Sequence, residues 1–359
     1  MNRLNKKLLS IILLLFACFG SVFVKTKVEA LANSTSEIVM EVNTNRIVYE
    51  NNARIKKYMA STTKILTAIA IIENCDINEK VVVTKETVGV EGSSIYLVEG
   101  EVLTVKELLY GLMLRSGNDC AETLAVHCSK TISNFAELMN NLAKKIGAND
   151  SHFVNPHGLH NDNHYTTAYD LALISCYAMK NPIFREIVST KSVRICHTKR
   201  DYDRILVNKN KMLSQFEGST GIKTGYTKKA GRCLVSSCKR NGLEFVCVVL
   251  NCGSMFERSK ELLNSAFENY SNKLIIKSEN ILLFIPIKDS NEKCGVYIKN
   301  DVILPLTNNE FDNLIIKIDT PKIINKSILK DDCVGEIQIY YENNLLFEEK
   351  IYSIIDVNI

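Results

Sequence analysis

The sequence predicts an α/β fold of the α+β kind: an antiparallel sheet flanked by helices, with a helical region inserted into it, and a small all-β domain behind it. Strand-like segments lie at both ends of the first 270 residues, while the middle carries helical patterns. The last strands of this part follow one another through short turns, which favours antiparallel pairing, and Asn241-Gly242 predicts a two-residue hairpin turn between two of them. From residue 272 on, Ile, Lys and Asn dominate short alternating runs, the pattern of a second β domain.

The N-terminus predicts a secretory signal peptide over residues 1–32. A basic start is followed by the apolar run Leu8–Val24 and by Ala30-Leu31-Ala32, which has the A-x-A form of a cleavage site. We therefore expect a catalytic domain over residues 33–271, a β-rich domain over 272–359, and an exported protein of the cell wall or the extracellular space. The alternative is an uncleaved anchor, because the apolar run is borderline for spanning a bilayer. Membrane contact is expected only if this segment is retained.

The charge balance argues against a polyanion-binding protein, and the cysteine spacing indicates what most of the cysteines do. The chain has 44 basic and 40 acidic residues, and residues 1–32 hold five of the former and one of the latter, which leaves 39 of each in the remainder. A balanced charge implies no nucleic acid or other polyanion as partner. Twelve cysteines are scattered without any Cys-x-x-Cys pair, and we expect most to be small buried apolar side chains.

The catalytic domain begins with a hairpin and a buried helix. Glu37–Val42 and Arg46–Glu50 flank a polar turn and predict two paired strands. The segment from Ser61 to about Glu73 predicts a helix that is apolar nearly all round, which is typical of a central buried helix.

The helical middle contains a tight loop. Thr104 and Glu107 form a capping box that starts a helix with Leu108–Met113, and this helix is expected to stop at Ser116-Gly117. Asn118 or Asp119 can cap the next helix. Further elements are expected as helices over 121–130, 134–146, 170–179 and 254–270, and as strands over 221–226, 232–238, 243–250, 273–277, 281–287, 314–318, 335–341 and 345–352.

Ser61 and Lys64 have the spacing of a nucleophile and its base. Residues three apart on a helix share a face, so the two side chains can meet. Lysine accepts a proton only as the neutral amine, and burial or a nearby cation lowers its pKa. For Lys64, the apolar helix provides the burial and Lys223 provides the nearby cation, so we expect its pKa to be lowered. The helix N-terminus at Ser61 favours a developing alkoxide.

Two further motifs complete the candidate site. Ser116 offers a hydroxyl that can relay a proton from Lys64 to a leaving amine, and Asn118 an amide that can bind substrate and orient Lys64. In Lys223-Thr224-Gly225 we expect Lys223 and Thr224 to face a substrate carboxylate and Gly225 to leave room for a substrate backbone beside the strand.

The backbone N–H groups of Ser61 and of Tyr226, which follows Gly225, are candidate oxyanion-hole donors. Taken singly, each motif is more often a helix start, a helix-linking turn or a solvated strand end. Their joint occurrence, in this order, behind an export signal favours one active site.

With these motifs, the chain resembles the serine D-alanyl-D-alanine carboxypeptidases, the low-molecular-mass penicillin-binding proteins. The resemblance covers roughly residues 35–270 and includes His157-Gly158-Leu159 and Asp170-Leu171-Ala172. It implies the penicillin-recognising serine transpeptidase and β-lactamase-like fold, and a peptidoglycan stem peptide as substrate. Ser61 is then the nucleophile, Lys64 the general base and Ser116 the proton relay; β-lactams acylate Ser61, and no metal or organic cofactor is needed.

Two departures from the family and two alternatives remain. Some members have histidine where this chain has Tyr226, and members often end in an amphipathic helix where this chain predicts a strand. A serine β-lactamase of the same fold would need a base for deacylation; Glu137 and Asn141 have a suitable spacing but are expected on a solvated helix face. A non-catalytic penicillin-binding or wall-binding protein is the other alternative.

The four histidines between 152 and 164 are expected in a structured loop beside the site, and a zinc site is the less favoured interpretation.

Overall fold

The computed structural model describes residues 34–278 and 280–359, so the predicted signal peptide lies outside the described residues. The described residues divide into two compact units: one comprises the chain up to residue 239 together with 244–263, and the other comprises 240–243 and 264–359. The expected division at 271/272 stays a prediction. No helix among the described residues is long and apolar enough to cross a membrane.

A five-stranded antiparallel sheet forms the centre of the first unit. Its strand order is β2-β1-β9-β8-β7, so both ends of the catalytic domain contribute to one sheet, as predicted. The strands are β1 (Ser36–Glu41), β2 (Ile47–Asn51), β7 (Ser219–Thr227), β8 (Gly231–Arg240) and β9 (Leu243–Leu250). Asn241 and Gly242 both have positive φ (50° and 80°), the conformation of the expected two-residue hairpin turn between β8 and β9. β7 is an edge strand, and the candidate site lies along it.

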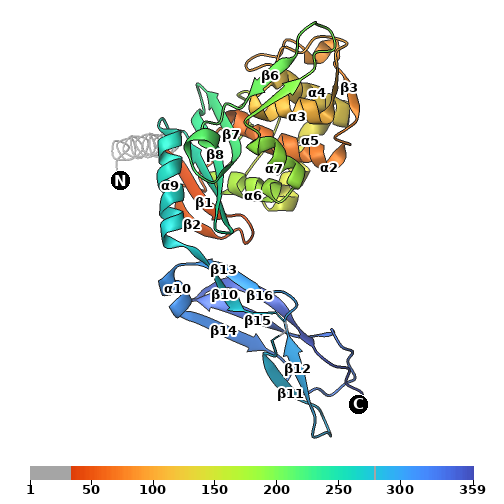
Figure 1. The fold of residues 1–359 in the computed structure, drawn as a ribbon, viewed down its shortest axis with the longest axis vertical. Coiled ribbons are helices and arrows are strands. Elements are labelled where there is room, and N and C mark those ends of the chain that lie inside the picture. Colours follow the sequence, from red (N-terminus) through yellow and green to blue (C-terminus); the bar gives the residue numbers. More distant parts are fainter. Residues whose placement is uncertain (1–33, 279) are drawn as a thin grey trace, which may run out of the picture. The chain divides into compact units, whose positions relative to one another are not determined.

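Helices cover both faces of this sheet (Figure 1). The inserted region consists of 3₁₀ turns η1 (Ala60–Thr63) and η2 (Lys85–Thr87), helices α2 (Lys64–Asn74), α3 (Val105–Leu114), α4 (Asn118–Ser129), α5 (Ile132–Ile146), α6 (Ala168–Met179), α7 (Pro182–Ser189) and α8 (Met212–Gln215), and short strands β3 (Lys80–Val82), β4 (Val102–Thr104), β5 (Ser192–Ile195) and β6 (Arg204–Val207). α9 (Met255–Asn269) packs on the opposite face, where Arg258 Nε donates to Glu37 Oε1 of β1 at 2.8 Å.

The main core lies between the sheet and α2. Ile65, Leu66 and Ile69 of α2 are at most 1% exposed and pack with Ile38 of β1 and Val235 of β8. The prediction that α2 is buried nearly all round is therefore confirmed. The capping box of Thr104 and Glu107 at the start of α3 is also confirmed.

The second unit is built mainly of strands, as predicted. Its sheet has the order β11-β12-β16-β15-β14 beside a two-stranded pair β10-β13. Its elements are β10 (Ser271–Ile276), β11 (Leu283–Pro286), β12 (Lys293–Tyr297), β13 (Val302–Leu306), α10 (Asn308–Asp312), β14 (Leu314–Asp319), β15 (Cys333–Tyr341) and β16 (Asn344–Ser353). The expected list of strands omitted β12 and β13, because a glycine interrupts β12 and a proline interrupts β13, and both residues weaken a strand pattern.

None of the eleven cysteines in the described residues forms a disulfide. Seven of them are buried, which agrees with the prediction that most act as small apolar side chains: Cys120, Cys176, Cys233, Cys238, Cys247, Cys252 and Cys294.

Candidate active site

Ser61 lies in the 3₁₀ turn η1, directly before α2. The expectation that the α-helix starts at Ser61 is wrong by three residues: the first α-helical residue is Lys64, and the preceding turn is tighter. Such 3₁₀ turns are common at helix N-termini. The consequence for the site is small, since Lys64 Nζ still lies 3.2 Å from Ser61 Oγ.

Lys64 is completely buried and held by fixed acceptors. Its Nζ donates to Asn118 Oδ1 and to the carbonyl oxygen of His157, both at 2.7 Å. A neutral amine has two N–H bonds and one lone pair. These two carbonyl oxygens use both N–H bonds, so the lone pair is left for the hydroxyl of Ser61. The pKa of Lys64 is lowered well below its ordinary value, first by burial and then by the positive charge of Lys223.

The loop between α3 and α4 places Ser116 and Asn118. Asn118 Nδ2 donates to the Glu91 carbonyl oxygen at 2.5 Å, which turns Oδ1 toward Lys64. Ser116 has a positive φ of 65° and lines the cavity described below. Among the described residues its hydroxyl has no hydrogen-bond partner. The expectation that Asn118 or Asp119 caps α4 is wrong: the cap is Gly117, without a side-chain bond, and α4 starts three residues earlier than expected.

Residues of β7 alternate between the helical region and the cavity. Lys223 is 1% exposed and donates to the Thr224 carbonyl oxygen at 3.0 Å; burial, and then Lys209, lower its pKa to about 7. Thr224 and Tyr226 point to the other face of the strand and line the cavity. Direct binding of a substrate carboxylate by Lys223 stays a prediction.

Gly225 lies against the turn that carries Ser61. A Cβ at this position would be 3.0 Å from the Met59 carbonyl oxygen and 3.0 Å from the Ser61 nitrogen. Glycine therefore lets β7 approach the nucleophile closely, a role that the sequence did not suggest. Its expected contact with a substrate backbone stays a prediction.

The backbone of Tyr226 is oriented away from the sheet. Arg232 is the cross-strand partner of Tyr226, and its carbonyl oxygen accepts from Cys252 N at 2.8 Å, on the side of β9. In an antiparallel ladder this makes Tyr226 and Arg232 a non-hydrogen-bonded pair, so the N–H of Tyr226 points outward from the edge of β7. This direction suits the role of an oxyanion-hole donor beside Ser61 N.

The loop that contains Gly158 and His164 contacts the turn that carries Ser61. His164 accepts from Val154 N at Nδ1, so its Nε2–H donates to Thr63 Oγ1 at 2.8 Å, and Thr63 in turn donates to the Ala60 carbonyl oxygen. Burial lowers the pKa of His164 to about 3, which keeps the ring neutral. Gly158, with a φ of 87°, packs directly on the Ala60 carbonyl.

One carboxylate fixes the loop that borders the site, and sequence reasoning missed it. Asp119 accepts from Ser94 Oγ at 2.5 Å and from the backbone nitrogens of Ile95, Leu97 and Cys120 at distances between 2.9 and 3.3 Å. The sequence feature that could have pointed to Asp119 is its position directly after Asn118.

A buried ion pair also fixes this loop, at Ile95 and Tyr96. Arg204 of β6 pairs with the fully buried Glu101 and donates to the Ile95 and Tyr96 carbonyl oxygens. The hairpin of β5 and β6, which carries Arg204, was also missed, because its strands are short.

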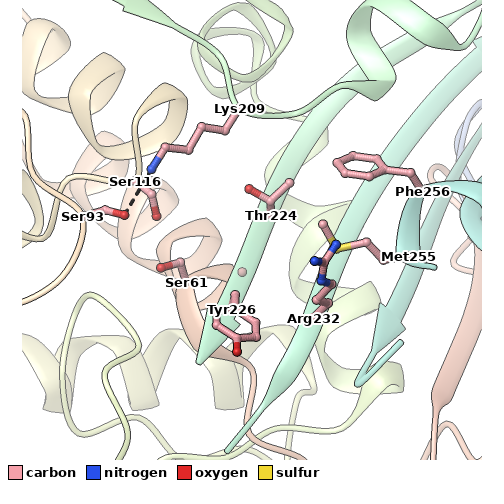
Figure 2. A pocket seen from close by; sticks show the side chains of 10 residues that line it. Ser61, Ser93, Ser116, Lys209, Thr224, Tyr226, Arg232, Met255 and Phe256 are labelled. Atoms are coloured by element: carbon pink, nitrogen blue, oxygen red, sulfur yellow. Dashed lines mark hydrogen bonds between the residues drawn. The ribbon is translucent and has the colours of Figure 1, made fainter. Parts of the chain in front are cut away.

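A cavity of about 450 Å³ joins the three motifs (Figure 2). Its lining combines the predicted Ser61, Ser116, Thr224, Gly225 and Tyr226 with the unpredicted Ser93, Lys209, Arg232, Met255 and Phe256. Glu137, the possible β-lactamase base, is instead an exposed residue of α5, as predicted.

The charge of Lys223 gives a pH prediction. Because a cation beside Lys64 disfavours its protonated form, Lys223→Met should raise the pKa of Lys64. Acylation needs the neutral amine, so its rate rises with pH through this pKa, and the midpoint of that rise should move to higher pH in the variant. The measurement is the rate of covalent labelling by a fluorescent penicillin from pH 5 to 10. A midpoint that moves to lower pH would contradict the account.

The family model described as D-alanyl-D-alanine carboxypeptidase matches residues 24–254, and the model described as penicillin-binding protein 5, C-terminal domain, matches residues 270–358. The D-alanyl-D-alanine carboxypeptidase DacF of Bacillus subtilis is 29% identical and aligns over 97% of this chain and 92% of its own length. The D-alanyl-D-alanine carboxypeptidase of Streptomyces sp. K15 is 33% identical over 62% of this chain and 82% of its own length.

Solved structures agree with these matches. The carboxypeptidase DacD of Francisella tularensis has a TM-score of 0.69 at 26% identity and covers 90% of this chain and 93% of its own. Penicillin-binding protein 5 of Haemophilus influenzae, at 22% identity, shares the fold with a TM-score of 0.77, covering 90% of this chain and 97% of its own. A serine held against a buried lysine, within a chain matched over more than half its length by that family model, leads to one conclusion: this chain belongs to the D-alanyl-D-alanine carboxypeptidase family of serine peptidases.

Proposed function

We propose that the chain removes the terminal D-alanine from peptidoglycan stem peptides through an acyl-enzyme on Ser61, and that β-lactams acylate the same oxygen. The observation that carries this proposal is the environment of Lys64, whose Nζ lies 2.7 Å from each of two carbonyl oxygens and 3.2 Å from Ser61 Oγ. This route uses neither a metal nor an organic cofactor.

The reaction has two acyl-transfer steps. Ser61 Oγ attacks the carbonyl carbon of the penultimate D-alanine, and its proton passes to Lys64 Nζ. The N–H groups of Ser61 and Tyr226 stabilise the negative oxygen of the tetrahedral intermediate. The C–N bond then breaks, and the proton moves from Lys64, through the Ser116 hydroxyl, to the leaving amine. In the second step water attacks the ester, and the proton returns to Ser61 Oγ.

The composition of the cavity favours a carboxypeptidase over a β-lactamase. None of the described residues that line the cavity is a carboxylate, so no side chain there offers a strong base for rapid hydrolysis of a penicilloyl ester. We therefore expect the penicillin adduct to persist for many turnovers of the peptide reaction. An exported location in the wall or outside the cell follows from the predicted signal peptide and the wall substrate.

The test uses the purified protein and two substrates. We expect D-alanine release from a stem peptide ending in D-Ala-D-Ala, and a stable adduct with a fluorescent penicillin that peptide mass spectrometry locates on Ser61. Fast release of hydrolysed penicillin would favour the β-lactamase. A stable adduct without D-alanine release would favour the non-catalytic binding protein, and an adduct on another residue would contradict the mechanism.

A further inference from the structure

Two cysteines that the mechanism does not use contact each other in the helical region. Cys75 directly follows α2, and Cys128 is the second-last residue of α4. Their thiols form a hydrogen bond with each other. Of the eleven cysteines in residues 34–278 and 280–359, these are the two of intermediate exposure, so the pair packs against the core and is still reachable from solvent.

The two helices that end at these cysteines also start together. At their first residues, Lys64 Nζ donates to Asn118 Oδ1 at 2.7 Å. Cys75 follows eleven residues after Lys64 and Cys128 ten residues after Asn118, which correspond to nearly equal helical rises of about 16 and 15 Å. Because α2 and α4 pack on each other within the helical region, their C-terminal ends meet as well (Figure 1).

An ion pair beside the thiols joins the same two segments. His127, directly before Cys128, contacts Glu79, four residues after Cys75, with Nε2 and Oε2 3.2 Å apart. The thiols therefore meet because of how the two helices pack, and their contact does not depend on the rotamer of one side chain.

The hydrogen bond between the thiols gives them different chemistry. The bond that Cys75 donates lowers the pKa of Cys128 to about 6, against an opposing effect of burial, and the Ser129 hydroxyl lowers it further. The same bond raises the pKa of Cys75. At neutral pH Cys128 is therefore mainly a thiolate, the nucleophilic form of cysteine, and Cys75 is a thiol held against it. An attacking cysteine and a resolving cysteine have this arrangement.

We propose that Cys75 and Cys128 are a modification site for small disulfides, the oxidised form of low-molecular-mass thiols, and close a bond that joins α2 to α4. Cys128 Sγ attacks one sulfur of the small disulfide, whose S–S bond breaks, and one thiolate leaves. Cys75 then loses its proton and attacks Cys128 Sγ, which releases the second thiolate. The two cysteines lose two electrons and two protons, and the small disulfide becomes two thiols. The inference does not depend on the proposed function.

The bond would enclose the segment that carries Ser116 and Asn118. The closed loop runs from Cys75 to Cys128, about 50 residues. A cross-link over a loop of this length stabilises a protein mainly by restricting the unfolded chain. Because the thiols are already in contact, closing the bond requires little movement of Lys64 at the other end of α2. We therefore expect a more stable protein with an unchanged rate of acylation.

The experiment treats the purified protein with oxidised glutathione near neutral pH and then with dithiothreitol. Peptide mass spectrometry should find a cross-link between Cys75 and Cys128. The unfolding temperature should rise by about 5–10 °C and fall back after reduction. The rate of penicillin labelling should stay within about twofold of that of the reduced protein. The double variant Cys196→Ser/Cys333→Ser removes the two exposed cysteines of the described residues and should keep the full temperature shift.

Two single substitutions test the order of attack. In Cys75→Ser the hydroxyl can still donate to Cys128, so Cys128 should accumulate as its mixed disulfide with glutathione. In Cys128→Ser the remaining Cys75 should react at least about tenfold more slowly, because it has no thiolate character at neutral pH. Neither variant should show the temperature shift.

The outcomes that overturn the inference are distinct from those that bear on the proposed function. Mixed disulfides on both cysteines of the wild type without a cross-link would overturn it, and so would a full temperature shift in Cys128→Ser. Loss of penicillin labelling when the bond closes would contradict the expected arrangement of α2 and α4. A reduced protein that is not labelled at all overturns the proposed function alone, because the cross-link and the temperature shift are measured without penicillin.

Discussion

Replacing Lys64 by methionine is expected to slow acylation of Ser61 by at least about 10³-fold, within the range that general-base catalysis contributes. Methionine has nearly the same length and fits a buried site, but it has no lone pair on nitrogen for the hydroxyl proton. Lys64 Nζ is the hydrogen-bond partner recorded for Ser61 Oγ in the described part of the chain. The measurement is the second-order rate of labelling by a fluorescent penicillin, together with D-alanine release.

The same variant carries a stability cost of different origin. Removal of the amine leaves Asn118 Oδ1 and the His157 carbonyl oxygen without their donor, which costs about 1–3 kcal/mol for each buried acceptor. Lys228→Met, an exposed lysine of the β7–β8 turn, is the matched control and should keep both rate and stability. Acylation at the wild-type rate in folded Lys64→Met would show that another group takes the proton.

Gly158→Ala is expected to destabilise the protein by about 3 kcal/mol and to slow acylation by about 100-fold. A Cβ there would lie 1.9 Å from the Ala60 carbonyl oxygen and 2.8 Å from Thr63 Oγ1, both in the turn that holds Ser61. The backbone must move, and the nucleophile moves with it. Urea unfolding measures the first effect, and penicillin labelling measures the second.

Gly147→Ala is the matched control for backbone conformation. Gly147 also has a positive φ, 96°, but nothing lies within 4 Å of an added Cβ. It should therefore cost only about 1 kcal/mol and leave acylation unchanged. Equal effects of the two substitutions would mean that the contact with Ala60 has no bearing on catalysis.

Sequence patterns predicted the parts of this structure in which local chemistry agrees with the final packing. The apolar helix after Ser61, the capping box at Thr104 and the Asn241-Gly242 hairpin each have a signal within a few residues, and each is confirmed. The three motifs were also expected to meet, because their order along the chain resembles that of a known family.

What the sequence could not predict depends on contacts between distant segments. Arg232 and Thr224 line one cavity only because of the β7–β8 register, and Arg204 meets Glu101 across about a hundred residues. The inward direction of Lys223 follows from the pleat of β7 beside the helical region. No local pattern specifies which face of an edge strand will carry the substrate.

The four hydrogen bonds accepted by Asp119 have a consequence for how this enzyme tolerates change. The carboxylate that immobilises the 94–97 backbone is the immediate neighbour of the amide that aligns the catalytic amine. A change in the length of that loop would therefore displace Asn118 and, with it, the Lys64 amine that takes the proton. Variation among natural sequences should accordingly accumulate at other rims of the cavity, where a new side chain alters substrate choice without disturbing the chemistry.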